Sequence, residues 1–425
     1  MIKHVLKIIW AQRRNNGWIF AELFIVACAL WYVADRLYVD VITWNTPLGY
    51  DIENTWRFKL MKLGPSSPSF VPESEYASDQ TADLLKLMEQ IRLHPAVEEV
   101  CVTYYSCPYS GGNSWGNPFP VDEDTAGFST HKSLQIRRVS PEYFDVFRVK
   151  DLQGRSLTST IKKAEVIDRQ VIITEDLEAL FFKGKSAYGR KLRYDNSEVD
   201  VPVLAVSCPV RADEYSKSEP ALYELLVGER MEESVNDLGA ENAELCVRMK
   251  RQLSKDEINS LLEETSERLT VNNLNVYGVM PVAGLRDLRI SQRNAGQCKQ
   301  LSLAVFLLVN AFFGIVGTFW LRTRQRRGET GLRIALGANR FRLKEYFFSE
   351  GVLLLLLTVP LSLVFVANMI AADIPDTYRL SNTAGRFIVS FGGIYLLMAL
   401  MIVAGIRLSI QKAMAMTPAE ALHHE

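Results

Sequence analysis

The chain has 425 residues, of which 48% are hydrophobic and 23% charged, and its formal net charge at pH 7 is −1. Near-neutral charge gives no electrostatic reason to expect a nucleic acid as partner. The average composition suits neither a fully soluble enzyme nor a carrier that fills the membrane, because apolar runs at both ends flank a long polar middle. This segregation predicts a membrane protein with a large folded part outside the bilayer.

The N-terminal part combines a basic segment with an apolar run. Residues 1–16 are basic and amphipathic, which is typical of a helix in the cytoplasmic headgroup layer; a plain topogenic tail explains them equally well. The apolar run 17–39 is long, and no A-x-A-like site follows it, so we interpret it as an uncleaved anchor and not as a signal peptide. Glu22 lies near the end of the run, where its carboxylate can reach the interface or meet a basic partner.

Residues 40–285 contain no run able to span a bilayer and should fold outside the membrane. Their hydrophobic patterns predict an α+β fold. Strands are expected at 55–63, 97–105, 133–139, 170–174, 191–194, 201–206, 222–227, 244–250 and 271–279, and helices at 81–93, 141–146 and 255–269. An early and a late strand–helix–strand unit enclose a β-rich insert at about 150–210, and the two units can form one split, ferredoxin-like layer. The Gly-, Asn- and Pro-rich segment 108–120 is predicted to be an exposed loop.

Four cysteines fall in this middle part, at Cys101, Cys107, Cys208 and Cys246. An oxidising compartment permits disulfides, and four cysteines allow three full pairings. Cys101 and Cys107 are near enough in sequence to form a disulfide, and reduced buried thiols are an equal alternative.

The segment 286–321 begins as a polar helical stretch and runs into the second apolar span, which predicts a stalk continuous with a membrane helix. Small residues in this span permit close helix contact. Asn310 could donate a hydrogen bond across a dimer interface or satisfy its amide within its own helix. The third and fourth spans are expected at 346–371, with Glu350 at its cytoplasmic end, and at 387–406.

The segment 322–345 separates the second and third spans and carries eight basic and two acidic residues. Its basic excess predicts a cytoplasmic location. Glu329 and Arg333 are four residues apart, and Leu332 and Leu336 fall on one helical face, so we expect a short amphipathic helix. Four spans then place both termini in the cytoplasm, including the tail 407–425, and leave 372–386 as a short external loop.

The segment 322–345 resembles the cytoplasmic loop of the MacB/FtsX/lipoprotein-release class of ABC transporter permeases, which runs Arg-x-Glu-Ile-Gly-Ile-x-x-Ala-Leu-Gly-Ala. Thr330 departs from this pattern, where the family has an aliphatic residue. The resemblance implies that this helix couples the permease to a separate ATPase. Its candidate coupling residues are Arg327, Glu329, Gly331, Leu332, Arg333, Ala335, Leu336, Gly337 and Ala338.

Other segments resemble landmarks of the same family. These are 94–100, 141–157 and 171–192 of its periplasmic core domain, and 413–422 of its C-terminal tail. The family often has a glutamate at the position of Glu350. The resemblance implies a periplasmic MacB-type core domain over 40–285, built from ferredoxin-like porter-type units and the β-rich insert, and four membrane helices in the cell inner membrane.

The resemblance also implies partners and a mode of action. We expect a homodimer, or a heterodimer with a related permease, that binds an ABC ATPase. It would transmit ATP-driven movement to the periplasmic domain for efflux or export, with a periplasmic adaptor and an outer-membrane channel as further candidate partners. Alternatives are an ABC-linked signalling protein, a regulator of a cell-wall hydrolase, and a lipoprotein-release permease.

The chain itself lacks recognisable catalytic signatures. Gly184, Lys185 and Ser186 do not follow the first glycine of a P-loop. His423 and His424 lack further ligands at metal-binding spacing. We therefore expect no catalytic residue, metal or cofactor of its own, with ATP bound by the partner subunit.

Overall fold

The computed structural model describes residues 7, 9–11, 13–110, 114–121, 134–164, 169–194, 197–264, 269–325 and 340–414. The chain divides into two compact units. The helical unit comprises the described parts of Met1–Asn45 and Asn294–Glu425, and the sheet unit comprises those of Thr46–Arg293.

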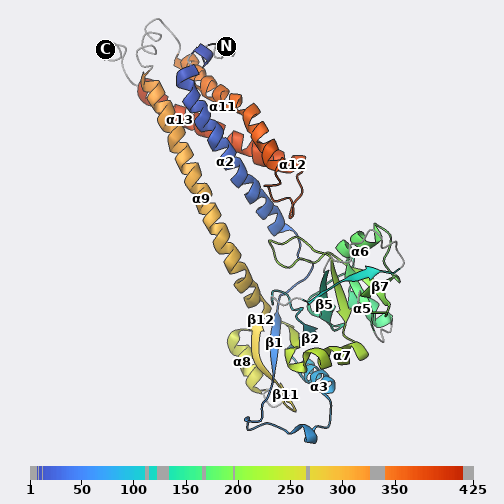
Figure 1. Ribbon diagram of the computed structural model, residues 1–425. Helices are drawn as coiled ribbons and strands as arrows, with labels where there is room; N and C mark the ends of the chain where they lie inside the picture. Colours follow the sequence, from blue (N-terminus) through green and yellow to red (C-terminus); the bar gives the residue numbers. More distant parts are fainter. Residues whose placement is uncertain are drawn as a thin grey trace. The chain divides into compact units, whose positions relative to one another are not determined.

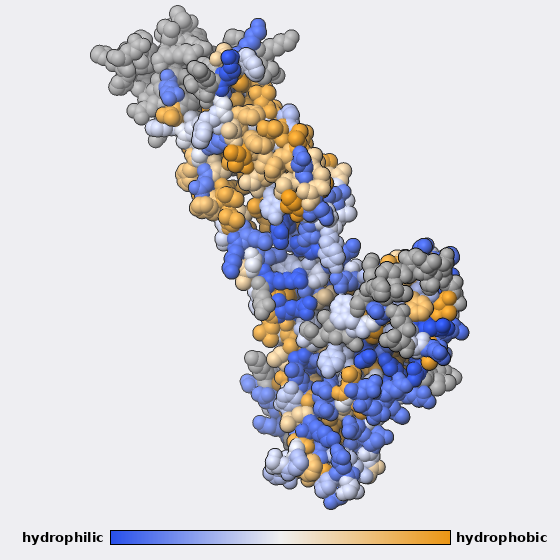
Figure 2. All heavy atoms as spheres, viewed as in Figure 1, coloured by the Kyte–Doolittle hydropathy of each residue, from blue (hydrophilic) through white to orange (hydrophobic). Residues whose placement is uncertain are grey.

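The described part of the helical unit consists of long helices and two short helical segments, which are drawn in blue, gold, orange and red in Figure 1. They are α2 (Arg13–Asn45), the later part of α9 (Val282–Gln325), α11 (Arg340–Ala371), α12 (Ala384–Phe387), a π-helical turn η5 (Ile388–Gly392) and α13 (Gly393–Met414). Among the described residues, four helical stretches are long and apolar enough to cross a membrane: Asn16–Asn45, Val282–Thr318, Glu345–Ala371 and Ala384–Arg407. Figure 2 shows hydrophobic side chains gathered over these helices.

The apolar faces of these helices pack against one another. Leu23 of α2 lies in one buried cluster with Leu354 of α11 and Met398 of α13. Helices α13 and α9 approach closely at Gly405, since a Cβ there would lie 3.1 Å from Val316 Cγ2. The helices run beyond the predicted spans: α2 begins before residue 17 and continues past 39, so its last turns extend the first span.

The sheet unit is built on one mixed sheet, whose strands are labelled in part in Figure 1. Within the described residues the order is β11-β12-β1-β10-β2-β5-β9-β6-β8-β7-β4, and β3 pairs with β5. The strands are β1 (Thr55–Lys62), β2 (Val97–Tyr104), β3 (Ser114–Gly116), β4 (Pro118–Pro120), β5 (Leu134–Val139), β6 (Val171–Thr174), β7 (Lys191–Tyr194), β8 (Val201–Ser207), β9 (Ala221–Leu225), β10 (Glu244–Met249), β11 (Thr270–Val271) and β12 (Leu274–Pro281).

Two strand–helix–strand units interleave at one end of the sheet, as the sequence pattern predicts. The first is β1–α3–β2, with α3 at Gln80–Arg92, and the second is β10–α8–β12, with α8 at Lys255–Glu264. Their four strands lie in the order β12-β1-β10-β2 and are all antiparallel. Asp79 caps α3 by accepting a 2.7 Å hydrogen bond from Ala82 N, which satisfies a free helix-end donor.

The other end of the sheet carries the parallel pairs β5–β9 and β6–β8. Short helices accompany these strands: α4 (Tyr143–Val146), α5 (Leu157–Lys163) and α6 (Glu175–Phe182). Helix α7 (Glu229–Leu238) instead packs with α3 in the core at the first end of the sheet, and 3-10 turns occur at Glu73–Glu75 and Ala240–Asn242. Buried aromatic residues fill one core here, where the Tyr143 and Phe147 rings lie 4.7 Å apart between centroids.

Two sequence predictions need correction. The single strand expected at 271–279 is a hairpin, because a turn at Asn272 and Asn273 separates β11 from β12. Asn272 has a φ of 51°, a left-handed conformation that asparagine tolerates better than most residues. The segment 108–120 is not simply an exposed loop, since it contributes β3 and β4 and buries Tyr109.

Candidate functional site

The coupling residues predicted between 327 and 338 lie outside the described residues. The other predicted polar residues of the helical unit are described. The structure does not bring these residues together into one site.

Glu22 marks a contact between α2 and α9. Thr318 Oγ1 donates to Glu22 Oε2 over 3.2 Å and also to the carbonyl oxygen of Gly314 over 2.7 Å. A Cβ at Gly314 would lie 2.5 Å from Glu22 Oε1, so the small residue makes room for the carboxylate. The carboxylate therefore has a partner between two apolar helices, which lowers the cost of holding it there.

Asn310 and Glu350 differ in their surroundings. Asn310 is exposed on α9, and its amide donates to the carbonyl oxygen of Phe306 over 2.7 Å, within the same helix. This bond matches the self-satisfied alternative, and the hydrogen bond across a dimer interface remains a prediction. Glu350 is buried on α11.

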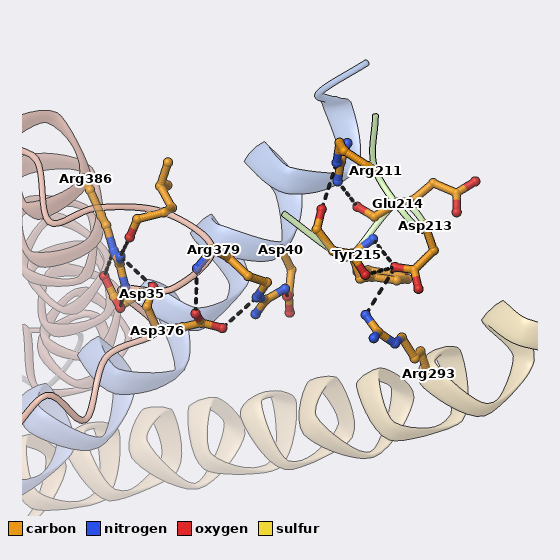
Figure 3. Close-up of polar contacts among 12 residues, drawn as sticks. Asp35, Asp40, Arg211, Asp213, Glu214, Tyr215, Arg293, Asp376, Arg379 and Arg386 are labelled. Carbon is orange, nitrogen blue, oxygen red and sulfur yellow. Dashed lines mark hydrogen bonds and ion pairs between the residues drawn. The ribbon is translucent and has the colours of Figure 1, made fainter. Parts of the chain in front are cut away.

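A buried ion pair joins α2 to the segment that precedes α13 (Figure 3). Arg386 Nε and Nη2 donate to the two carboxylate oxygens of Asp35 over 2.8 and 2.6 Å. The remaining nitrogen, Nη1, donates to the carbonyl oxygens of Asp376 and Leu380. Such a bidentate pair fixes the guanidinium in orientation as well as in place.

A second ion pair lies near the same end of α2. Arg379 donates through Nη1 to Asp40 and through Nε to Asp376, each over 2.6 Å. Burial raises the pKa of Asp376, but hydrogen bonds from Arg379 outweigh it and hold that pKa below its usual value. The loop predicted at 372–386 is thus tied to α2 by charge.

In the sheet unit, residues 209–216 form a loop that we call the anchor loop. Its Arg211 donates to the carbonyl oxygens of Thr46 and of Glu214, and the Arg211 backbone N–H donates to Leu48 O over 3.0 Å. Gly49 has a φ of 84°, and a Cβ there would lie 2.1 Å from Pro209 O. The anchor loop therefore holds residues 46–49, through which the chain enters the sheet unit from α2.

The same loop holds the start of α9, through which the chain leaves the sheet unit. Arg286 forms an ion pair with Glu214. Arg289 Nε and Arg293 Nη1 each donate to the Asp213 carboxylate over 3.2 Å. The spacings of three and four residues place the three arginines on one helical face. Figure 3 draws Arg293 pointing from α9 toward Asp213.

The carboxylate of Asp213 is the centre of this contact, with only 1% of its side chain exposed. Ser216 Oγ and Tyr215 N also donate to it, over 2.7 and 3.0 Å. Burial raises the pKa of Asp213, but the Ser216 hydrogen bond, the charge of Arg293 and the Arg289 hydrogen bond outweigh this effect and lower that pKa. The group stays ionised near neutral pH, so the anchor suits mechanical attachment and not proton transfer.

All six cysteines are free thiols in the structure. Cys101 and Cys246 are directly opposite each other on β2 and β10, and Cys107 lies in the same buried cluster. Burial raises the pKa of Cys101 and of Cys107. Of the two alternatives for Cys101 and Cys107, the structure contains the reduced one.

The described ranges contain no group of three or more His, Cys, Asp or Glu residues arranged to hold a metal ion. Two groups of arginines were not predicted from the sequence: Arg379 with Arg386, and the three arginines at the start of α9. A local signal existed for the second group, because Arg286, Arg289 and Arg293 share a helical face. Their partners lie more than 70 residues earlier in the chain, and no periodicity links the two segments.

No family model and no curated protein sequence matches the chain. Among solved structures, the periplasmic region of MacB from Actinobacillus actinomycetemcomitans aligns at 14% identity and a TM-score of 0.33, covering 56% of this chain and 94% of that one.

Two further solved structures align to a similar extent. The extracellular domain of the noncanonic ABC-type transporter YknZ from Gram-positive bacteria shows 15% identity and a TM-score of 0.29, over 52% of this chain and 100% of that one. A domain of a Porphyromonas gingivalis protein described as a permease shows 16% identity and a TM-score of 0.33, over 56% and 93%.

The structure itself defines a class of protein. Apolar helices of membrane-spanning length enclose, in sequence, a large mixed α/β unit. This is the architecture of a membrane protein with a large α+β domain between its first and second candidate spans.

Proposed function

We propose that the chain is the permease subunit of an ABC transporter of the MacB/FtsX class. In this proposal it has no enzymatic activity or cofactor of its own, and a separate ATPase binds the segment 322–345 on the cytoplasmic side of the cell inner membrane. The sheet unit lies in the periplasm, and the subunit works as a dimer in export across the envelope.

One observation carries the mechanical part of the proposal. The anchor loop binds both connections of the sheet unit, residues 46–49 through Arg211 and the start of α9 through Asp213 and Glu214. Movement of α9 relative to the end of α2 would therefore act on a single loop. That loop is continuous with β8, which ends at Ser207, so the load reaches the sheet directly.

The proposed cycle follows from helix continuity. Helix α9 runs from Val282 to Gln325 without a break, so its last turn already lies within the segment 322–345. ATP-driven closure of the ATPase pair would displace that segment, and an unbroken helix transmits displacement because its backbone hydrogen bonds resist stretching. The sheet unit would then change its shape and move substrate in the periplasm, without an aqueous pore through the helical unit.

The test replaces the apolar ridge of the coupling segment. Leu332→Asp combined with Leu336→Asp should abolish co-purification with an ABC ATPase subunit, because a docking ridge that carries two carboxylates cannot be buried against a partner. Arg340→Gln, outside the ridge, is the matched control. Membrane insertion of each variant is checked by fractionation. If the double variant inserts normally and still retains the ATPase, the coupling assignment is wrong.

A further inference from the structure

The sheet unit contains a cavity of about 300 Å³ beside strands β5, β6, β8 and β9. This volume is at the lower end of the range for small-molecule sites, roughly 300–1,000 Å³. One part of its lining is apolar and includes Trp115, Ile136, Val171, Val199 and Val201. Trp115 and Val199 are exposed large hydrophobic residues, so they offer contact area to a ligand at little cost.

The other part of the lining is charged. The buried carboxylate of Glu224 accepts hydrogen bonds from Tyr194 Oη over 2.5 Å, from Arg230 Nη2 over 2.7 Å and from Arg138 Nε over 3.2 Å. Burial raises the pKa of Glu224, but the charge of Arg230 and the Tyr194 hydrogen bond outweigh it, so the carboxylate is ionised. Glu224 is fully engaged by the protein and needs no further donor.

The cations of the lining exceed its anions. Arg138, Arg169 and Arg230 line the cavity together with Glu224. Glu233, which is not part of the lining, pairs with both Arg169 and Arg230. The five groups, three arginines and two glutamates, together carry one net positive charge. Of the three arginines, Arg138 forms its ion pair with Glu224 alone among the described residues.

Arg138 also has unused hydrogen-bonding capacity. Among the residues that the structure describes, its guanidinium donates only through Nε, and the side chain is 24% exposed. The two Nη groups are a planar pair of donors that can bind a carboxylate or a phosphate in bidentate fashion. Since the Arg138 side chain is only partly desolvated and its one ion pair among the described residues is made through Nε, an anion is the favoured occupant of the Nη groups.

We propose that this cavity binds a small amphipathic molecule with one anionic group, a carboxylate or a phosphate. The anionic group lies on the Nη atoms of Arg138, and the apolar part packs against Trp115, Val199 and Val201. This binding does not depend on the proposed transport function.

The test uses the full chain in lipid nanodiscs and three probes of the same shape: 4-phenylbutanoate, 4-phenylbutyl phosphate and 4-phenylbutylamine. Binding is measured by saturation-transfer NMR and calorimetry, with empty nanodiscs subtracted. At least one anionic probe should bind, and the amine should bind at least about tenfold more weakly, the effect of one charge-assisted hydrogen bond. The ratio between the two anionic probes identifies the preferred head group.

Three substitutions locate the site. Arg138→Gln should weaken binding of the preferred anion about tenfold. Val199→Asp places an acid beside the ligand and should weaken it similarly while leaving Arg138 and its pair intact. Arg155→Gln removes an exposed arginine outside the lining and should change nothing.

Several outcomes would overturn the proposal. These are equal binding of the amine and the anions, no anion binding above that of empty nanodiscs, or unchanged binding in both Arg138→Gln and Val199→Asp. If Arg138→Gln fails to fold, Val199→Asp alone decides, because its side chain lies at the surface.

Discussion

Replacing Asp213 with asparagine should loosen the start of α9 without unfolding the sheet. The three donors on Oδ1, from Tyr215, Ser216 and Arg293, can still be accepted by the amide oxygen. The amide nitrogen would then face Arg289 Nε, so one hydrogen bond is lost and donor opposes donor.

The free energy lost in this variant can be worked out from the exposure of the two arginine side chains. The side chains of Arg289 and Arg293 are 36% and 47% exposed, so solvent screens both ion pairs and each contributes up to about 1 kcal/mol. Loss of both pairs costs about 2 kcal/mol, which corresponds to about a 30-fold change in a local opening equilibrium. Hydrogen exchange of residues 282–293, measured by mass spectrometry on the full chain, should accelerate by about that factor.

Asp287→Asn is the matched control, because this carboxylate lies on the same helix but is 77% exposed. It should change exchange by less than about twofold, since exposed pairs contribute little. Strands β2 and β10 report on global stability. Unchanged exchange at 282–293 in Asp213→Asn, or an equal rise of exchange in β2 and β10, would refute this prediction.

Three further predictions concern other buried groups. Burial raises the pKa of Glu244 to about 7, above its unfolded value of 4.5, so its stabilising contribution is complete below pH 4.5 and disappears as the pH rises through 7. Glu244→Gln should remove up to about 3 kcal/mol of the loss in unfolding free energy between pH 5 and 8.5, and an unchanged pH slope would contradict this. Arg386→Met should destabilise the helical unit by about 3–5 kcal/mol, because it leaves Asp35 buried and unpaired. The double variant with Asp35→Asn should melt above that single variant in nanodiscs, and a lower melting temperature would count against the pair. Maleimide should label Cys298 in the native chain but Cys101, Cys107 and Cys246 only after denaturation, as their burial requires; native labelling of Cys246 would contradict the structure.

The local sequence pattern predicts the secondary structure of this chain better than it predicts the tertiary contacts. Strands β1, β2, β5, β6, β7, β8, β9 and β10 lie where alternating or continuous apolar residues predict them, because burial of one or both faces imposes that pattern. The hairpin between β11 and β12 was not predicted, because two asparagines inside a run of β-forming residues do not indicate a turn by composition alone. Helices α5 and α6 were also missed, because helices of seven and eight residues carry too few turns to show a clear period. Helix α7 was missed although its buried Met231 and Val235 are four residues apart.

The polar sites illustrate why the rest could not be predicted. Asp213 is an ordinary acid in an ordinary loop until folding brings it to Arg289 and Arg293, some 76 and 80 residues later. The same holds for Asp35 and Arg386, which are separated by 351 residues. Such pairs depend on tertiary packing, and the local sequence carries no information about contacts between distant segments. The coupling motif at 327–338 remains a prediction from resemblance.

The anchor loop has a consequence for how such a chain could have arisen. Because Arg211 and Asp213 hold the two ends of the sheet unit beside one another, the unit begins and ends at nearly one place. A folded segment with adjacent ends can be inserted into a connection between two helices, or removed from it, without separating those helices. The sheet unit therefore has the form of a cassette, and related helical proteins could exchange it for another domain of similar end spacing while keeping their own bundle.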